Sequence, residues 1–102
     1  MIYRASEHGF KASNFHFHCD EKKPTLVIIK ALNNKEKKEE IFGGYTDIPW
    51  VSAYIRRYVE GFGNSFIFAL GNNYCFEIMK CTNKYQEVLH DKDSKCCFAN
   101  DF

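Results

Sequence analysis

The chain has 102 residues, of which 45% are hydrophobic and 17% are aromatic. This length suits one domain with one hydrophobic core, and the aromatic share argues against disorder over most of the chain. The formal net charge is only +1, which gives no electrostatic case for binding nucleic acid or anionic lipid. No apolar run approaches the roughly 20 residues of a membrane span. Because residues 1–10 also lack the apolar core of a signal peptide, we expect a cytoplasmic protein.

Cysteine usage points to the same compartment. The chain contains an odd number of cysteines without an even framework, which argues against a secreted disulfide scaffold. We therefore expect reduced thiols. The cysteines are Cys19, Cys75, Cys81, Cys96 and Cys97.

The first predicted element is a short helix. Apolar residues at spacings of three and four predict a helix over residues 10–19, after a break at residues 7–9. Its candidate buried face consists of Phe10, Phe15 and Cys19. The helix is short, so tertiary packing must hold it.

Residues 25–31, Thr-Leu-Val-Ile-Ile-Lys-Ala, give the strongest strand pattern in the chain. The unbroken apolar run predicts burial on both faces, as in a sandwich with helices packed outside. Residues 33–40 carry interleaved Lys and Glu, which predicts a solvated hairpin tip. The alternative, a nucleic-acid-binding arm, is disfavoured because the glutamates cancel most of the lysine charge. A returning strand over residues 40–43 follows.

Residues 42–50, Phe-Gly-Gly-Tyr-Thr-Asp-Ile-Pro-Trp, are the most informative stretch. The glycine pair permits either positive φ or a close backbone approach, at a strand that ends, bends or bulges. Pro49 has no N–H and ends any ladder. Trp50 is the only tryptophan and the largest single hydrophobic anchor. Asp47 is expected to organise its own turn through an Asx bond.

The rest of the chain predicts one further helix and several short strands. Helical spacing of apolar residues predicts a helix or helical loop over residues 51–62. Residues 65–70 and 74–80 read as a strand hairpin joined by a Gly-Asn-Asn turn. Short strands are expected over residues 85–90 and 96–99, on either side of a charged loop.

Candidate chemistry is sparse. The His-Phe-His-Cys run at residues 16–19 contains zinc ligand types, but its two histidines point to different sides of a helix and no CxxC or HxxxH supplies further ligands. Packed or exposed histidines are therefore the preferred interpretation. A Cys/His nucleophile pair needs a lowered thiol pKa and a positioned base, which the sequence does not show. We assign no catalytic, cofactor-binding or metal-ligating residue.

The distinctive motifs lie in a definite order, at residues 3–10, 13–20, 24–30, 42–50 and 65–70. In order and spacing they resemble the TLDc domain, which is associated with TBC and LysM domains and with oxidation resistance proteins. The residues that match the family signature are expected to be mainly structural. They are Gly9, Phe10, Phe15, His16, Cys19, Asp20, Thr25, Leu26, Phe42, Gly43, Gly44, Tyr45, Pro49, Trp50, Phe66, Phe68 and Leu70.

The resemblance implies an α+β fold, mainly antiparallel β, with a two-sheet β-sandwich flanked by short helices. It implies one TLDc-like domain over residues 1–102 that is partial, because family domains extend further at both ends. Ala99 also stands where the family usually has glycine. A missing closing strand would leave a sheet edge exposed.

The resemblance also implies a role. TLDc proteins are linked to protection from oxidative stress and to binding the vacuolar proton-pumping ATPase (V-ATPase), and no agreed catalytic residues come with the family. The leading hypothesis is a non-enzymatic protein-interaction module whose partners include peripheral V-ATPase subunits. The alternative is a thiol-based redox-active protein that uses Cys19 or Cys96/Cys97. A third possibility is an inactive remnant that cannot close its sandwich.

Overall fold

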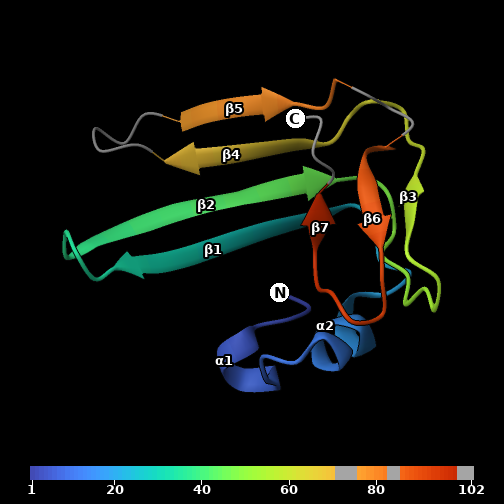
Figure 1. Ribbon diagram of the computed structural model, residues 1–102, viewed down its shortest axis with the longest axis horizontal. Helices are drawn as coiled ribbons and strands as arrows, with labels where there is room; N and C mark the ends of the chain where they lie inside the picture. The colour runs from blue at the N-terminus through green and yellow to red at the C-terminus, as the bar shows by residue number, and fades with distance from the viewer. Residues whose placement is uncertain (71–75, 83–85, 99–102) are drawn as a thin grey trace.

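The structure, a computed structural model, describes residues 1–70, 76–82 and 86–98. Its elements are α1 (Ala5–His8), α2 (Ala12–Cys19), β1 (Thr25–Asn33), β2 (Lys38–Thr46), β3 (Arg57–Val59), β4 (Phe66–Leu70), β5 (Phe76–Lys80), β6 (Val88–His90) and β7 (Cys97–Phe98). The strands form two antiparallel sheets, with orders β1-β2-β4-β5 and β3-β6-β7, and the helices lie together at one end (Figure 1). The mainly antiparallel α+β fold is confirmed.

The break predicted at residues 7–9 is wrong for its first two residues, which form the last half of α1. Gly9 ends this helix with a φ of 100°, a conformation that suits glycine. The Tyr3 hydroxyl donates a hydrogen bond to the Gly9 carbonyl at 2.7 Å. A helix of four residues is too short to show a period, so the sequence could not reveal it. Among the described residues, neither helix has the length and apolar character that crossing a membrane requires.

The helix predicted over residues 10–19 is present as α2, which begins two residues later. Phe15 and Cys19 are each only 4% exposed, as predicted. Phe10 is 70% exposed, so its place on the buried face is wrong. It lies in the bend before α2, where no helical geometry turns it inward. His16 is buried on α2 as well.

The hairpin with a charged tip is confirmed. Strand β1 pairs with β2 without interruption from Thr25↔Thr46 to Asn33↔Lys38. Burial of β1 on both faces is wrong, because β1 is an edge strand and several of its apolar side chains face solvent. The apolar run therefore belongs to a strand with two apolar faces. The described residues of the chain cover one of these faces.

The glycine pair lies inside β2, so the predicted strand end or bend at the glycines is wrong. Neither glycine has a positive φ. The predicted close approach is confirmed instead: a Cβ on Gly43 would collide with the Val27 carbonyl oxygen of β1. A Cβ on Gly44 would lie 2.5 Å from Cζ of Phe98. The bare backbone at Gly44 thus lets the ring of β7 lie directly on the first sheet.

The turn after β2 also differs from the expected one. Thr46 Oγ1, not Asp47, accepts the backbone N–H of Ile48, at 3.1 Å. Asp47 instead uses Oδ2 to accept a bond from the Asn64 amide at 3.0 Å. The Asx turn predicted for Asp47 is therefore wrong, because the residue two positions on is Pro49, which has no N–H to donate.

The helix predicted over residues 51–62 is wrong. Residues 51–56 have no regular structure, and β3 follows them. The Ala53 carbonyl accepts the N–H of Lys92 at 2.9 Å, so this segment bonds to the loop after β6. Within the segment, the Ala53 N–H donates to the Val51 carbonyl at 3.0 Å, which is not the i→i−4 bond of a helix. Tyr54 and Ile55, which the spacing placed on one helical face, are largely exposed. Helical spacing here is coincidental.

The later strands follow the prediction. Strands β4 and β5 pair from Phe66↔Lys80 to Leu70↔Phe76, which confirms the hairpin, and its turn lies outside the described residues. Strands β6 and β7 are shortened forms of the strands predicted over 85–90 and 96–99. Residues 85 and 99 lie outside the described residues.

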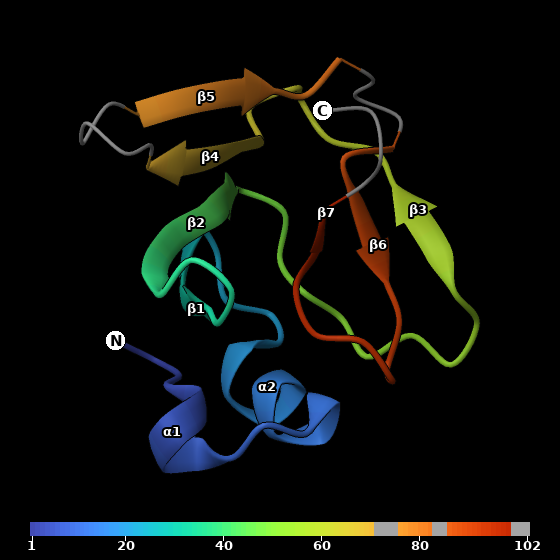
Figure 2. The ribbon, with the colours of Figure 1, turned by 60° about the vertical axis from the view of Figure 1, so that its left-hand side comes forward.

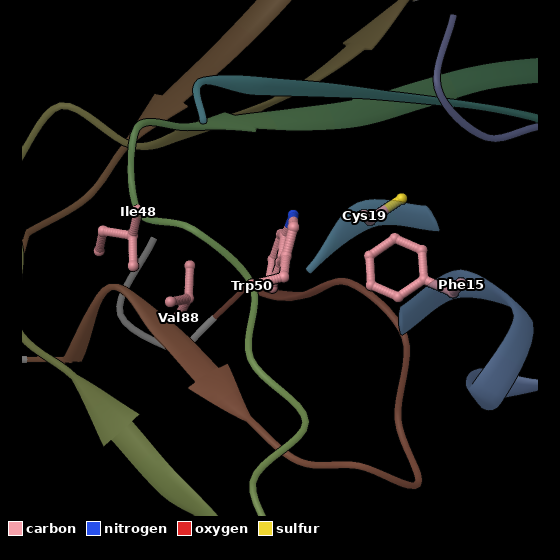
Figure 3. Packing of buried hydrophobic residues seen from close by; sticks show 5 residues of the cluster. All are labelled: Phe15, Cys19, Ile48, Trp50 and Val88. Carbon is pink, nitrogen blue, oxygen red and sulfur yellow. The ribbon is translucent and has the colours of Figure 1, made fainter. Parts of the chain in front are cut away.

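Trp50 organises the core, as predicted, and is 1% exposed (Figure 3). Its ring makes edge-on contacts with Phe15 of α2 and Phe98 of β7, at centroid distances of 5.9 and 5.7 Å. Its Nε1–H donates to Thr25 Oγ1 of β1 at 3.0 Å. One side chain therefore links a helix and both sheets. The buried cluster comprises Phe15, Cys19, Ile48, Trp50 and Val88.

Candidate interaction surface

Strand β3 lies at the outer edge of the second sheet (Figures 1 and 2). Large exposed side chains occur before, along and after this strand. Tyr54, Ile55 and Phe62 are 88, 84 and 88% exposed, and Tyr58 on β3 is about half exposed. Arg56 stands among them, with Nε 3.5 Å from Asp91 Oδ2. Aromatic and arginine side chains are enriched where protein interfaces carry their binding energy. We call Tyr54, Ile55, Arg56, Tyr58 and Phe62 the β3 flank.

Polar contacts hold the start of this segment. The Ser52 hydroxyl donates to Asp20 Oδ2 at 2.6 Å, which ties the segment to the end of α2. Ala53 is buried, and its carbonyl accepts the Lys92 N–H. The exposed residues Tyr54 and Ile55, which follow Ala53, therefore project from a backbone that is fixed by these bonds.

Glu87 fixes the other end of the segment that contains β3, at Gly63 and Ser65. Its carboxylate is fully buried; Oε2 accepts the N–H of Gly63 at 2.8 Å, and Oε1 accepts the N–H of Ser65 at 3.1 Å. Its own N–H donates to the Val59 carbonyl at 3.0 Å. These bonds satisfy a buried carboxylate that would otherwise be costly. A Cβ on Gly61 would collide with Oε2, so the glycines here are the only sequence signal for Glu87, which the sequence analysis missed.

His16 ties α2 to the loop after β6. Its Nδ1 lies 2.6 Å from Asp20 Oδ1, and its Nε2 lies 2.9 and 2.6 Å from the carbonyl oxygens of Asp91 and Ser94. All three partners accept, so both ring nitrogens donate and the ring is an imidazolium. Burial lowers the pKa of His16, but the contacts with Asp20 and the two carbonyls outweigh it, and the pKa is raised above 6.5.

These contacts confirm His16 as a packed histidine. With both nitrogens donating, His16 has no lone pair to offer a metal ion. In the described part of the chain, no three His, Cys, Asp or Glu side chains meet as a metal site. His18 is half-buried, with Nδ1 2.9 Å from the Asn14 carbonyl oxygen.

Opposing shifts of His16 and His90 predict a stability maximum near pH 6.5. Because the folded-state pKa of His16 is raised, its stabilisation is fully present below about 6.5 and is lost as the pH rises through that raised pKa. Burial is the chief cause that lowers the pKa of His90, so stability is also lost as the pH falls below about 6.5.

Urea unfolding between pH 5 and 8.5 checks this expectation. The free energy of unfolding should decline on both sides of the maximum. In His16→Gln the decline above the maximum should disappear while the decline below it remains. An unchanged alkaline decline in that variant would contradict the imidazolium assignment.

The thiol of Cys19 is not activated. Burial is the main cause that raises the pKa of Cys19 to about 11, and the charges of Cys96 and Asp20 add to it. At neutral pH such a thiol stays protonated and is a poor nucleophile. Cys96 packs at the margin of the same core cluster. The side chain of Cys97 lies outside the described part of the structure.

An apolar hollow of about 370 Å³ lies between the inner face of the first sheet and β7. Its lining includes Val27, Ile29, Phe42, Met79 and Phe98. Ligand sites usually add a few convergent polar groups that fix orientation. The described side chains that line this hollow are apolar except that of Cys96, which brings a thiol to the hollow without a histidine or carboxylate beside it in the lining.

The family-signature residues other than Gly9 and Phe10, which lie before α2, fall into two groups. Those near the core gather around Trp50, and a backbone bridge joins Asp20 to Trp50. Those of the first sheet include Tyr45 and Phe66, whose rings stack at 5.2 Å. Phe10 and Leu26 are largely exposed and contribute little to the core. The core group is Phe15, His16, Cys19, Asp20, Thr25, Pro49 and Trp50, and the sheet group is Leu26, Phe42, Gly43, Gly44, Tyr45, Phe66, Phe68 and Leu70.

Comparison with known proteins identifies the family. The chain is 30% identical over 76 residues to GTPase-activating protein skywalker of Drosophila melanogaster. This match covers 69% of this chain and 12% of that protein. It is 29% identical over 89 residues to TBC1 domain family member 24 of Xenopus tropicalis, and 28% identical over 89 residues to the Xenopus laevis protein of that name. Each of these two matches covers 87% of this chain and 14% of the relative.

The chain therefore spans 12 to 14% of the length of these curated relatives. No solved structure shows a significant match. The family model of the TLDc domain matches residues 1–99, nearly the whole chain. The chain belongs to the TLDc-domain family.

Proposed function

We propose that this chain is a non-enzymatic TLDc-type interaction module that binds a cytosolic protein partner through the β3 flank. The supporting observation is a set of highly exposed anchors on a segment fixed at both ends, by Ser52–Asp20 and by Glu87. A surface that is ordered before binding loses less conformational freedom on association. Rigid display of large apolar side chains therefore favours recognition of a folded partner.

The polar cluster around His16 supports a role without catalysis. In a serine–histidine pair, a ring nitrogen of the histidine accepts the proton of the attacking hydroxyl. Here both ring nitrogens of His16 donate, and the Ser52 hydroxyl bonds to Asp20 and not to His16. The cluster is arranged to hold α2, the β3 segment and the loop after β6 together.

The partner we propose is the peripheral sector of the V-ATPase, with protection from oxidative stress as the cellular consequence. Family membership supports this choice, since both roles are linked to TLDc proteins. The GTPase-activating function in the name of the Drosophila relative is that protein's own, and the chain matches 12% of its length. A thiol-based redox function through Cys19 or Cys96/Cys97 has less support, because the Cys19 thiol is buried and has a raised pKa.

Affinity capture from lysate with identification of the bound proteins tests this proposal. Wild-type chain should recover peripheral V-ATPase subunits. Ile55→Glu and Phe62→Glu, which lie in the β3 flank before and after β3, should each reduce recovery at least about tenfold, because a carboxylate replaces an apolar anchor. Phe10→Glu changes a 70% exposed aromatic residue outside the flank and should leave recovery unchanged.

Two results would contradict the proposal separately. Absence of every V-ATPase subunit, under several nucleotide and salt conditions, would reject the partner. Equal recovery by wild-type chain and both flank variants would reject the β3 flank as the binding surface.

A further inference from the structure

The register of the first sheet places apolar side chains of four strands on one face. Directly paired residues of an antiparallel ladder share a face. One such row runs Ile28, Gly43, Phe68, Ile78, across β1, β2, β4 and β5. The neighbouring rows follow from the same pairings. We call this surface the outer sheet face; it comprises Leu26, Ile28, Lys30, Leu32, Glu39, Ile41, Gly43, Tyr45, Phe66, Phe68, Leu70, Ile78 and Lys80.

The protein core lies on the opposite face of this sheet. Phe98 lies against Gly44, and Trp50 bonds to Thr25, both on the inner face. Figure 2 shows the second sheet on that inner side, and no helix or strand of the described residues covers the outer sheet face. The outer face is therefore open to solvent.

The exposed part of this face is apolar and continuous across the sheet. Its aliphatic residues are more than half exposed on both edge strands, β1 and β5, and the stacked rings of Tyr45 and Phe66 lie between them. Monomeric proteins rarely expose apolar patches beyond a few hundred Å², and larger ones mark interaction sites. The most exposed apolar members are Leu26 at 59%, Ile28 at 64%, Leu32 at 62% and Ile78 at 58%.

The charges on the face favour an apolar partner. Lys30 Nζ lies 3.2 Å from Glu39 Oε1, so these two charges compensate each other. Lys80 is the remaining charged residue and sits on edge strand β5. A strongly acidic or basic partner would find little complementary charge here. A second copy of the same face would add neither strong electrostatic repulsion nor a group of charges without partners.

The area also fits a pair of like faces. If each exposed aliphatic side chain presents roughly 100 Å², two faces with their aromatic rings would bury about 1,000 Å², which is the minimum for a biological interface and suits a weak dimer. Sheets stack face to face about 10 Å apart, and a two-fold axis makes one patch serve both partners. We propose that two copies of this chain associate by stacking their outer sheet faces.

Sedimentation equilibrium of the 102-residue chain, from about 1 to 100 µM, tests the proposal across the range of typical weak dimers. Wild-type chain should show a reversible monomer–dimer equilibrium. Ile28→Glu on β1 and Ile78→Glu on β5 should each raise the dimer dissociation constant at least tenfold, because each places two carboxylates in an apolar interface. Phe10→Glu, outside the face, should leave the constant unchanged.

Every other outcome overturns the proposal. A wild-type chain that is monomeric at all concentrations would do so. If only one of Ile28→Glu and Ile78→Glu weakens the dimer, the copies pair through the edge of that strand and do not stack their faces. Weakening by Phe10→Glu to the same extent would indicate non-specific association. Circular dichroism must show that each variant is folded, and Ile28→Ser and Ile78→Ser replace any variant that is not. The β3 flank contributes no residue to these variants, so failure here leaves the proposed partner binding unaffected.

Discussion

Replacing Trp50 by alanine should lower the free energy of unfolding by about 3–5 kcal/mol. The indole is 1% exposed and contacts Phe15 and Phe98, so its removal leaves a cavity between α2 and β7. It also removes the Nε1–H donor from the Thr25 hydroxyl. The loss therefore combines transfer, cavity and hydrogen-bond contributions.

Urea unfolding followed by far-ultraviolet circular dichroism measures this loss without relying on tryptophan fluorescence. Phe62→Ala removes another aromatic ring, 88% exposed, and should change stability by no more than about 0.5 kcal/mol. If Trp50→Ala does not fold, Trp50→Phe keeps a ring but loses the donor and should cost about 1–2 kcal/mol. A near-neutral Trp50→Ala with loss of partner binding would instead assign the indole to an interface.

Replacing Glu87 by alanine should cost about 2–5 kcal/mol. The variant leaves two N–H donors, of Gly63 and Ser65, without the carboxylate that accepts them. It also empties the fully buried space beside Gly61. Since Glu87 fixes the end of the β3 segment, the loss should also loosen the presentation of Phe62.

Two readouts separate this role from a general packing effect. Hydrogen exchange should accelerate at the amides of Gly63 and Ser65 in Glu87→Ala. Glu60→Ala, at an exposed glutamate of the same segment, should change neither stability nor exchange at those amides. Equal stability of wild-type chain and Glu87→Ala would contradict the bracing role.

The sequence predicted those features that depend on near neighbours. The β-branched run of β1, the charged tip before β2 and the β4–β5 hairpin all appear in short, continuous patterns. Trp50 was predictable as an anchor because a large indole has few alternatives to burial. The motif order led to the family because it was preserved along nearly the whole chain.

Contacts between distant residues could not be predicted in this way. Glu87 and its two partners are 22 and 24 residues apart, and His16 meets the carbonyl of Asp91 75 residues away. A single charged residue in a predicted strand does not reveal such pairing. A glycine next to a strand was a weak signal for a buried carboxylate. It can be interpreted only once the structure shows that a Cβ on Gly61 would collide with the Glu87 carboxylate.

The exposed segments misled for a different reason. Apolar spacing does not distinguish side chains that pack in the core from exposed side chains that another molecule can cover. Tyr54 and Ile55 fit a helical face, and Leu26 and Ile28 fit a doubly buried strand, yet all four are exposed. The residues whose burial was predicted wrongly from their apolar pattern therefore belong to the β3 flank and the outer sheet face.

The interaction function is tested most directly by measuring the affinity of the purified V-ATPase peripheral sector for wild-type chain and for folded Ile55→Glu, with Phe10→Glu as the matched exposed control. Wild-type chain and Phe10→Glu should bind equally, and Ile55→Glu should bind at least about tenfold more weakly. Equal affinity for all three, or no measurable binding of wild-type chain, would contradict an interaction module that acts through the β3 flank.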